Sequence, residues 1–512
     1  MIIVINFGGQ TCHLIARRMR NLGVRAEVLP SDVNAGKILK LNPSGIVLSG
    51  GPSSVYEKGS PQMDKKILEL GIPVLGICYG LQLIAKYCNG KVLNSQLKEF
   101  GKTALYVKKN GKILKNLSKK EQVWMNHGDL VRELPEGFEI LASTEHCPIA
   151  AFENSKKKLY AIQFHAEVAH TLKGNQILKN FVFGICRSKK NWNVNDLAKN
   201  LINSIKKEIN RGSVIMGVSG GVDSTVAATL LRKAIGNRLY CVFVDHGLIR
   251  KNELEEVKNY FEKHLKFRHF YVVDASKKFL ERLKGVKDPE EKRKIIGHTF
   301  IEVFEKKVEE LEKKIPDIKF LGQGTIYPDR IESAQPSKHA SKIKSHHNVT
   351  LPDKMSLKVI EPLKDFYKDE VRVLGKMLGI PKEMIERHPF PGPGLAVRIL
   401  GDITEDKLRI LREADHIFIE ELKKSNQYSK VWQAFAALLP VKSVGVMGDA
   451  RTYDFIISLR AVTSVDAMTA DWAKLPYGLL EKVSNRIINE VRGVNRVVYD
   501  ISQKPPATIE YE

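Results

Sequence analysis

Short apolar runs that end in glycine and lead into amphipathic segments recur along this chain, and they constrain its fold more than any other feature. In the first part of the chain the runs are IIVIN at 2–6, GIVLSGG at 45–51 and PVLGICYG at 73–80. After a polar, lysine-rich segment, the pattern starts again with SVIMGV at 213–218 and LYCVFVD at 239–245. Strand, tight turn and helix in this order predict an α/β fold, with parallel sheets that helices cover on both faces.

The length of 512 residues suggests roughly three domains. We place the first boundary in the polar segment 187–196 and the second at HPFPGPG, 388–394, whose three prolines exclude a helix or a regular strand. The predicted domains are therefore 1–190, 195–388 and 389–512. The predicted helices are 10–21, 62–70, 80–88, 224–233 and 291–314; the segment 103–165 is predicted mainly as strands that end with LYAIQF at 159–164, and the polar segment 333–358 as a loop.

Charge and composition exclude several classes of protein. The net charge is +24, but the basic residues are spread along the whole chain instead of forming one stripe with aromatic residues, so we expect no nucleic-acid partner. No apolar run approaches the ~18 residues of a membrane-spanning helix, and the N-terminal segment lacks the basic start of a signal peptide, so we expect no membrane association. Six scattered cysteines without a CxxC pair predict a reducing, cytoplasmic location.

Cys78 is a candidate nucleophile, because it lies in GICYGLQ directly between an apolar strand and a helix. A nucleophile on such a turn stands above the edge of the sheet, and the helix N-terminus behind it favours the thiolate. The flanking glycines permit a sharp turn and let a substrate come close. The alternative is a buried structural cysteine.

His165 and Glu167 are the candidate partners of Cys78, because they follow the strand LYAIQF as His-Ala-Glu. Side chains at i and i+2 of a strand point to the same face, so the imidazole and the carboxylate can touch. Cysteine, histidine and glutamate together provide the nucleophile, the proton shuttle and the orienting carboxylate that acyl transfer through a thioester needs. The alternative is a solvated histidine beside an unrelated glutamate.

The loop Ser219-Gly220-Gly221-Val222-Asp223-Ser224 is a candidate phosphate site. Its glycines free backbone N–H groups at a helix N-terminus, and its hydroxyls add donors. Because Asp223 would repel bare phosphate, we expect Mg²⁺ to bridge it to phosphate oxygens. A structural glycine turn is the alternative. The adjacent His346 and His347 favour a solvated loop or a phosphate-contacting lid over a metal site, because chain neighbours diverge.

These motifs resemble known families. GICYGLQ, GGP at 50–52 and QFHAEV at 163–168 resemble class I glutamine amidotransferases, and SGGVDST at 219–225 is similar to the signature loop of ATP pyrophosphatases. Over essentially the whole chain, the set resembles the GMP synthase (glutamine-hydrolysing) family, with GQGTIYPDRIES at 322–333, IKSHHNV at 343–349, HPFPGPGLAVRILG at 388–401, GVMGDARTYD at 445–454 and KPPATIEYE at 504–512.

The resemblance implies an amidotransferase domain, a Rossmann-like ATP pyrophosphatase domain and a C-terminal α+β domain that forms a homodimer and completes the nucleotide site. In the first domain glutamine is hydrolysed through a thioester on Cys78, with His165 moving the proton and Glu167 orienting it. Gly51 and Tyr79 would hold the oxyanion through backbone N–H groups, and Gln82 would lie beside glutamine.

The resemblance also implies the chemistry of the second domain, which would transfer AMP from ATP to the 2-oxo oxygen of xanthosine 5′-monophosphate (XMP); ammonia would then displace AMP to give GMP. Adenylation turns an oxygen that cannot leave as oxide into a good leaving group. By family position Ser219–Thr225 bind the ATP phosphates, together with Mg²⁺, and Lys368 neutralises pyrophosphate. The residues that match the XMP contacts are Arg293, Gln433, Asp449, Arg451, Lys504, Thr508 and Glu510.

This chain departs from the family pattern at several positions. Asn6, Gly9, Thr11 and His246 replace a usual aspartate, serine, tyrosine and asparagine, and Ala166 replaces the proline between His165 and Glu167. None removes a catalytic group, although loss of the proline could loosen the end of the strand. The rival functions are an RNA-modifying ATP pyrophosphatase, a catalytically silent scaffold, and the same chemistry on another acceptor, as in NAD or asparagine synthesis.

Overall fold

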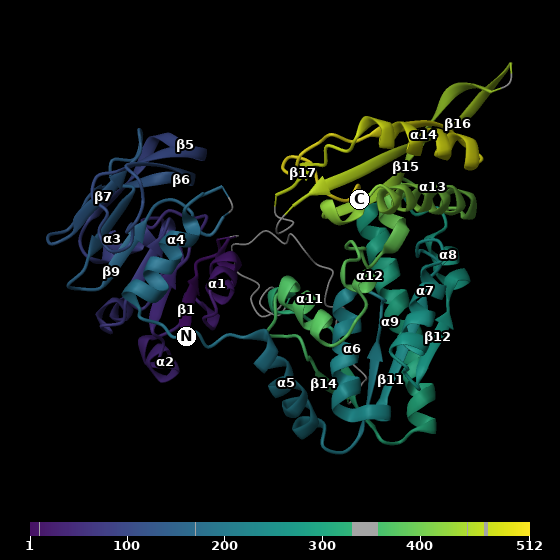
Figure 1. Ribbon diagram of the computed structural model, residues 1–512, viewed down its shortest axis with the longest axis horizontal. Coiled ribbons are helices and arrows are strands. Elements are labelled where there is room, and N and C mark those ends of the chain that lie inside the picture. Colours follow the sequence, from purple (N-terminus) through teal and green to yellow (C-terminus); the bar gives the residue numbers. More distant parts are fainter. Residues whose placement is uncertain (10, 169, 330–356, 448, 465–468) are drawn as a thin grey trace. The chain divides into compact units, whose positions relative to one another are not determined.

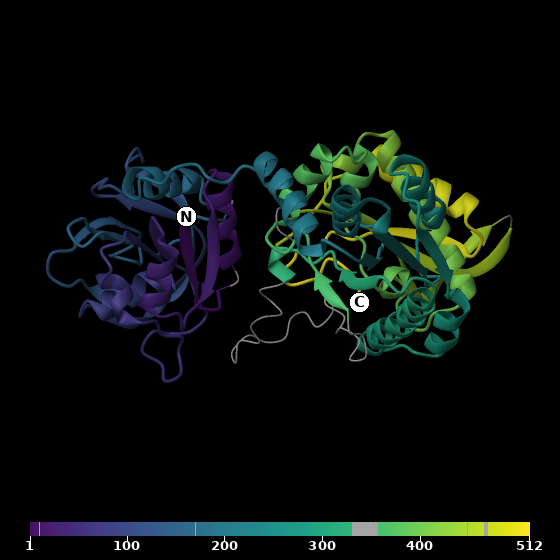
Figure 2. The same ribbon diagram turned by 90° about the horizontal axis from the view of Figure 1, so that it is seen from below.

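The computed structural model describes residues 1–512 except 10, 169, 330–356, 448 and 465–468 (Figure 1). The described residues form two compact units, 1–193 and the remainder from Val194 to Glu512. The chain enters the second unit through the segment that precedes α5 (Val194–Ile209), as Figure 1 and Figure 2 both show. No helix among the described residues is long and apolar enough to cross a membrane.

The first unit is built on one mixed sheet of nine strands in the order β2-β1-β3-β4-β9-β8-β7-β5-β6. The strands from β2 to β9 pair in parallel, and those from β9 to β6 are antiparallel. The strands are β1 Ile2–Asn6, β2 Ala26–Pro30, β3 Gly45–Leu48, β4 Val74–Ile77, β5 Lys91–Val107, β6 Lys120–Glu133, β7 Glu139–Ser143, β8 Ala151–Asn154 and β9 Leu159–Ile162. The helices include α1 Cys12–Asn21, α2 Ala35–Leu41, α3 Tyr79–Tyr87 and α4 Gly174–Lys179.

Burial along the strands explains this arrangement. Every residue of β3, β4 and β9 is buried, as expected for parallel strands that are covered on both faces. Alternate residues in the middle of β6 are buried, which is typical of an antiparallel strand with one solvated face. The predicted open mixed sheet is confirmed.

The second unit contains a parallel five-stranded sheet in the order β12-β11-β10-β13-β14, as predicted for a Rossmann-like domain. Its strands are β10 Ser213–Gly217, β11 Leu239–Asp245, β12 Phe270–Asp274, β13 Ile318–Gly322 and β14 Lys358–Ile360. Its helices include α6 Val222–Ile235, α7 Glu253–Asn259, α8 Ser276–Leu283, α9 Pro289–Lys314, α11 Lys368–Met377 and α12 Lys382–Ile385.

The last part of the chain adds a four-stranded sheet to the same unit. A long antiparallel hairpin forms its centre, and β18 pairs in parallel with the second strand of this hairpin. The strands are β15 Gln433–Met447, β16 Ala450–Thr463, β17 Asp471–Trp472 and β18 Val494–Tyr499, and the helices are α13 Glu405–Lys424 and α14 Tyr477–Glu490. One hydrophobic core joins this α+β part to the helices of the parallel sheet, with Val308 of α9 and Phe418 of α13 both fully buried.

Three sequence expectations were wrong in detail. The helix predicted at 62–70 is only a 3₁₀ turn, Lys65–Glu69, because Asp64 caps its start and Gly71 and Pro73 follow at once. The helix predicted at 224–233 is longer, because the glycine-rich loop ends at Gly221 and α6 begins at Val222. The strand predicted to reach residue 164 ends at Ile162. Most of the loop predicted at 333–358, including His346 and His347, lies outside the described residues.

Candidate functional site

Cys78 occupies a strained turn between β4 and α3. Its φ of 53° and ψ of −106° lie in a region that non-glycine residues rarely adopt. A Cβ on Gly76 would lie 2.5 Å from the carbonyl oxygen of Gly80, and a Cβ on Gly80 would lie 2.4 Å from that of Leu48. Only glycine fits on either side of the nucleophile, as the sequence predicted.

His165 and Glu167 form a buried pair beside Cys78. His165 Nδ1 lies 2.7 Å from Glu167 Oε1, and Glu167 is fully buried. A Cβ built on Gly50 would lie 3.1 Å from His165 Cε1 and 3.7 Å from Cys78 Cβ, so the imidazole and the cysteine converge on this glycine. His165 Nε2 is buried and has no hydrogen-bond partner among the described residues, which leaves it available for proton transfer.

The electrostatics of the pair favour a charged imidazole. Burial opposes protonation of His165, but the Glu167 carboxylate and the contact with Cys78 raise the pKa of His165 well above its usual value. Burial likewise acts to raise the pKa of Glu167, yet the charge and the hydrogen bond of His165 hold that pKa below its usual value. A cationic histidine beside a cysteine stabilises the thiolate, which is the reactive form.

The predicted contact between His165 and Glu167 is present, but the reason given for it was wrong. Both residues follow the end of β9 and lie in a loop, so strand alternation does not align them. The loop is held instead by hydrogen bonds: His165 N donates to the carbonyl oxygen of Trp124 at 3.0 Å, and Arg18 Nε donates to that of Glu167 at 2.9 Å. Thr171 Oγ1 donates to the carbonyl oxygen of His165 at 2.5 Å.

The remaining predicted residues of this centre lie around the same turn. Tyr79 is the first residue of α3, where backbone N–H groups have no partner within the helix. A Cβ on Gly51 would lie 2.7 Å from the Phe7 carbonyl oxygen, so only glycine fits there. Gln82 is buried and donates to the carbonyl oxygen of Asp129 at 3.1 Å.

The structure also brings residues to Cys78 that the sequence did not indicate. Gln163 Nε2 lies 3.5 Å from Cys78 Sγ, and the carbonyl oxygen of Asn126 lies 3.6 Å from the same sulfur. The hydroxyl of Thr11, one of the departures, lies 3.4 Å from His165 Nδ1. The sequence could have indicated Gln163, because it belongs to the QFHAEV motif. Asn126 contacts Cys78 through its backbone, so its side-chain type could not have indicated the contact.

The glycine-rich loop of the second unit leads into α6 as predicted. Ser219 Oγ and Ser224 Oγ are 3.2 Å apart, and Gly221 N donates to Ser219 Oγ at 3.3 Å. Gly220 has a φ of 71°, and Arg387 Nη1 donates to its carbonyl oxygen at 3.0 Å. Arg387 is a second-unit residue that sequence reasoning missed. Thr225 follows in the first turn of α6, with a buried hydroxyl that has no hydrogen-bond partner among the described residues.

Lys368 forms an ion pair with Asp223, although 145 residues separate them. Lys368 is the first residue of α11 and engages Asp223 Oδ2. The other carboxylate oxygen, Oδ1, is buried and has no hydrogen-bond partner among the described residues. This unbonded carboxylate oxygen lies at a loop of hydroxyls and backbone N–H groups. Such a combination suits a divalent cation that is bound together with phosphate.

The C-terminal segment is docked against the second unit. Arg398 is fully buried and donates to both Glu510 oxygens, at 3.0 and 2.9 Å, and Gln433 Nε2 donates to Glu510 Oε1 at 2.6 Å. Arg460 donates to the carbonyl oxygens of Thr508 and Ile509, each at 2.8 Å.

Further contacts continue this docking along both ends of the segment. Lys292 of α9 engages Glu512, next to Arg293, whose guanidinium pairs with Glu290. The backbone of Lys504 pairs with that of Ala470. The segment is therefore ordered by buried partners rather than frayed.

Asp449 and Arg451 lie at the other end of the hairpin from Gln433. The register pairs Gln433 with Val462 at the base of the hairpin and Arg451 with Val446 near its tip. At ~3.3 Å per residue, this spacing is on the order of 40 Å. One chain therefore does not bring these two residues to the cluster around Glu510.

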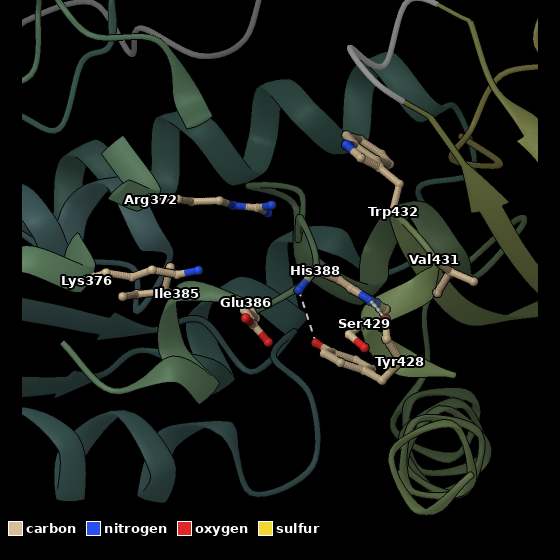
Figure 3. A pocket seen from close by; sticks show the side chains of 9 residues that line it. All are labelled: Arg372, Lys376, Ile385, Glu386, His388, Tyr428, Ser429, Val431 and Trp432. Carbon is tan, nitrogen blue, oxygen red and sulfur yellow. Dashed lines mark hydrogen bonds between the residues drawn. The ribbon is translucent and has the colours of Figure 1, made fainter. Parts of the chain in front are cut away.

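A cavity of about 260 Å³ lies in the second unit between α11 and the segment before β15. Arg372 of α11 and Trp432 stand on facing sides of it, with His388 between them (Figure 3). Burial lowers the pKa of His388 to about 4, and Tyr428 O and Ala434 N satisfy its two ring nitrogens as a neutral imidazole. The positive charge that lines the cavity therefore comes from Arg372 and Lys376, and Glu386 adds a negative charge.

The fold and the first centre define a class I glutamine amidotransferase that is joined to a nucleotide-binding α/β domain. Family models agree in each part: "Glutamine amidotransferase class-I" matches residues 3–185, "NAD synthase" residues 193–294 and "GMP synthase C terminal domain" residues 420–511.

The curated relatives specify the family. The chain is similar to GMP synthase [glutamine-hydrolyzing] of Aquifex aeolicus (56% identity), Thermosipho melanesiensis (55%) and Clostridium botulinum (51%), in each case over 100% of this chain and 99% of the relative. The chain belongs to the glutamine-hydrolysing GMP synthase family.

Proposed function

We propose that the chain aminates XMP to GMP in an ATP-dependent reaction, with ammonia that it releases from glutamine. The observation that carries this proposal is the strained Cys78 with the buried pair of His165 and Glu167, in a chain that matches GMP synthases over its full length. The Ser219–Thr225 loop in the second unit supports the ATP-dependent half.

At the first centre, the Cys78 thiolate attacks the carboxamide carbon of glutamine. His165, which already holds the proton of the Cys78 thiol, delivers it to the departing ammonia, and Glu167 keeps the imidazole oriented. The N–H groups of Gly51 and Tyr79 stabilise the oxyanion of the tetrahedral intermediate. Water then cleaves the thioester and releases glutamate.

At the second centre, the loop from Ser219 to Thr225 binds the ATP phosphates, and Lys368 neutralises the pyrophosphate as it leaves. Mg²⁺, bound with the phosphates at Asp223, would supply positive charge against the phosphate oxygens. The buried, unbonded Oδ1 of Asp223 supports this assignment.

An adenylated intermediate connects the two half-reactions. The 2-oxo oxygen of XMP attacks the α-phosphorus of ATP, which forms an O–P bond and releases pyrophosphate. Ammonia then attacks the activated carbon, AMP leaves with that oxygen, and a proton is lost to give GMP. The match of residues 420–511 to the GMP synthase C-terminal domain favours XMP over the acceptors used in NAD or asparagine synthesis.

Arg293, Gln433, Lys504, Thr508 and Glu510 are the proposed XMP contacts within one chain. Arginine and lysine suit the 5′-phosphate, and the amide and the carboxylate suit ring edges or ribose. The hydrogen bond that Gln433 Nε2 donates to Glu510 Oε1 supports the grouping of these two residues at one site.

Asp449 and Arg451 would then reach XMP from a second copy of the chain. The hairpin near them exposes apolar side chains, with Val446 74% exposed and Tyr453 60% exposed, which supports a homodimer formed through this ribbon. We also propose a cytoplasmic location, which the six cysteines without a disulfide support.

The experiment that tests this function is the substitution Cys78→Ala in the full chain. The proposal assigns glutaminase to residues 1–190 and GMP synthesis to residues 195–388 and 389–512. The variant is therefore expected to lose glutamine-dependent GMP formation and to keep ammonia-dependent formation. AMP and GMP are measured with XMP, ATP and magnesium, with glutamine or an ammonium salt as the nitrogen source. Retained glutaminase in the variant, or loss of both activities in a folded variant, contradicts the proposal.

A further inference from the structure

A second buried glutamate–histidine pair lies in the amidotransferase unit, and the mechanism above does not use it. Glu99 is on β5 and His127 on β6, and each is 5% exposed. Thr144 follows β7 and donates its hydroxyl to both Glu99 oxygens, at 2.7 and 2.9 Å. Burying a carboxylate is costly unless its partners compensate, so this pair requires an explanation.

The hydrogen-bond pattern fixes the orientation of the His127 ring. His127 Nδ1 lies 2.9 Å from the carbonyl oxygen of Asp129, and Nε2 lies 3.2 Å from Glu99 Oε2. Both ring nitrogens of His127 therefore have a partner, and the imidazole is held between the Asp129 carbonyl oxygen and the Glu99 carboxylate. Burial acts to raise the pKa of Glu99, but the hydrogen bonds from His127 and Thr144 hold it below its usual value.

The pair ends at the segment Asn126–Asp129, which forms one wall of the glutamine centre. The carbonyl oxygen of Asn126 contacts Cys78 Sγ at 3.6 Å. The carbonyl oxygen of Asp129, which accepts from His127, also accepts from Gln82 Nε2 at 3.1 Å. His127 thus contacts the same backbone oxygen as the side chain expected beside the substrate.

The strand ladder is interrupted within this segment. The register between β5 and β6 is interrupted between Asn94 and Glu99, where Asn94 is opposite Asp129 and Glu99 is opposite His127. Such irregularities remove ladder hydrogen bonds and bend the strand locally. Asn126 and Asp129 are paired with Phe100 and Asn94, but Gly128 between them has no partner in the register that the structure describes, so the His127 contacts add support at this point.

We propose that Glu99 is a positioning residue for glutamine hydrolysis, which acts through His127 on the segment Asn126–Asp129. The proposal rests on the assignment of Cys78 as the nucleophile. Among the described residues, Glu99 does not contact Cys78 or Gln82 directly. It orients the His127 imidazole, which contacts the Asp129 carbonyl oxygen, and this oxygen in turn accepts from the Gln82 amide.

A metal site is the rival explanation, because Glu99, His127 and Cys147 have ligand atoms within 4.8 Å of one another. The contacts disfavour it. Both His127 nitrogens and both Glu99 oxygens already have partners, and burial raises the pKa of the Cys147 thiol to about 12, which opposes the thiolate that binds metal.

The test compares Glu99→Ala and Glu99→Gln with a matched control, Glu153→Gln, in the full chain. Glu153 is also a buried carboxylate of this unit at 5% exposure, but it accepts from Lys112 N and Ile113 N, away from Cys78. Glutaminase KM and kcat, ammonia-dependent GMP synthesis and the thermal midpoint are measured for each variant, and the metal content is measured for the wild type.

Glu99→Ala raises the KM for glutamine roughly tenfold, the scale of one hydrogen bond to a carboxylate. Glu99→Gln restores most of the affinity for glutamine, because its amide can still accept from Thr144 and hydrogen-bond to the His127 ring. Glu153→Gln lowers the thermal midpoint but leaves the KM unchanged, and all variants keep ammonia-dependent synthesis. If Glu99→Ala does not fold, His127→Gln carries the test with the same expected rise in KM.

An unchanged KM in Glu99→Ala overturns the proposal, as does an equal rise in Glu153→Gln. Stoichiometric metal in the wild-type protein replaces it with the metal site. Cys78→Ala distinguishes failure of the nucleophile assignment from failure of the positioning role. If Cys78→Ala keeps glutaminase activity, Cys78 is not the nucleophile. If it loses this activity while Glu99→Ala keeps a normal KM, only the positioning role of Glu99 fails.

Discussion

Removal of the Glu510 carboxylate is expected to weaken both XMP binding and the docking of the C-terminal segment. Glu510 accepts two hydrogen bonds from Arg398 and one from Gln433, and its side chain is 21% exposed. Arg398 is completely buried, with its guanidinium carbon 4.2 Å from the ring centroid of Phe435. Glu510→Ala therefore removes both carboxylate hydrogen bonds of the buried Arg398, whose other ion-pair partner, Asp415, lies 3.9 Å away.

The size of the effect follows from this geometry. Breaking a buried ion pair from one side costs about 3–5 kcal/mol, and we reduce this to about 2–3 kcal/mol because water can reach the partly exposed side of the site. In a large unit about 2 °C of thermal midpoint corresponds to 1 kcal/mol, so a decrease of roughly 5 °C is expected. Loss of a direct charge-assisted contact with XMP would also raise its KM roughly 10- to 150-fold.

The assay combines thermal unfolding with ammonia-dependent AMP release at varied XMP concentration. Glu510→Gln keeps one carbonyl acceptor and should lose less stability than Glu510→Ala. Glu413→Ala breaks a more exposed pair with Lys251 in the same unit and should change the midpoint by less than about 2 °C. Glutaminase activity at Cys78 should persist throughout. An unaltered midpoint together with an unaltered KM for XMP in Glu510→Ala would refute both the stability argument and the assigned contact.

Two further outcomes are expected. Asp223→Asn should abolish AMP formation while glutaminase remains measurable, because the amide lacks the charge that holds Mg²⁺ at the phosphates; unchanged AMP release at ordinary magnesium concentration would contradict the role of Asp223. Val446→Glu should shift the protein from dimer to monomer in light scattering and reduce synthesis but not glutaminase activity. The control Tyr477→Glu, on α14 and 90% exposed, should leave the dimer intact. A dimeric Val446→Glu protein would place the interface elsewhere.

The sequence predicted the local chemistry well, because local motifs carry their own geometry. Glycines on both sides of Cys78 indicated a turn that only such a sequence permits, and the structure contains it. The loop before α6 was predicted for the same reason. The prediction for His165 and Glu167 was correct in its result and wrong in its cause, because hydrogen bonds from distant residues such as Arg18 hold the loop.

Contacts between distant segments could not be predicted from spacing. Nothing in the residues around Lys368 indicates, without the family resemblance, that it pairs with Asp223. The pairing of Glu99 with His127 depends on an irregular register between two long strands, and a period-2 pattern does not reveal such a shift. The long separation of Arg451 from Gln433 required the full length of the hairpin.

The ion pair between Asp223 and Lys368 makes nucleotide binding an exchange of partners instead of a simple addition. Under the proposed function, an incoming polyphosphate takes Lys368 away from Asp223 and leaves a carboxylate with uncompensated charge. Free ATP cannot supply the missing countercharge, whereas a nucleotide that arrives with its divalent cation can. The loop would therefore select the metal–nucleotide complex over the bare anion before any chemistry begins, and excess free ATP would be a poor competitor at this site.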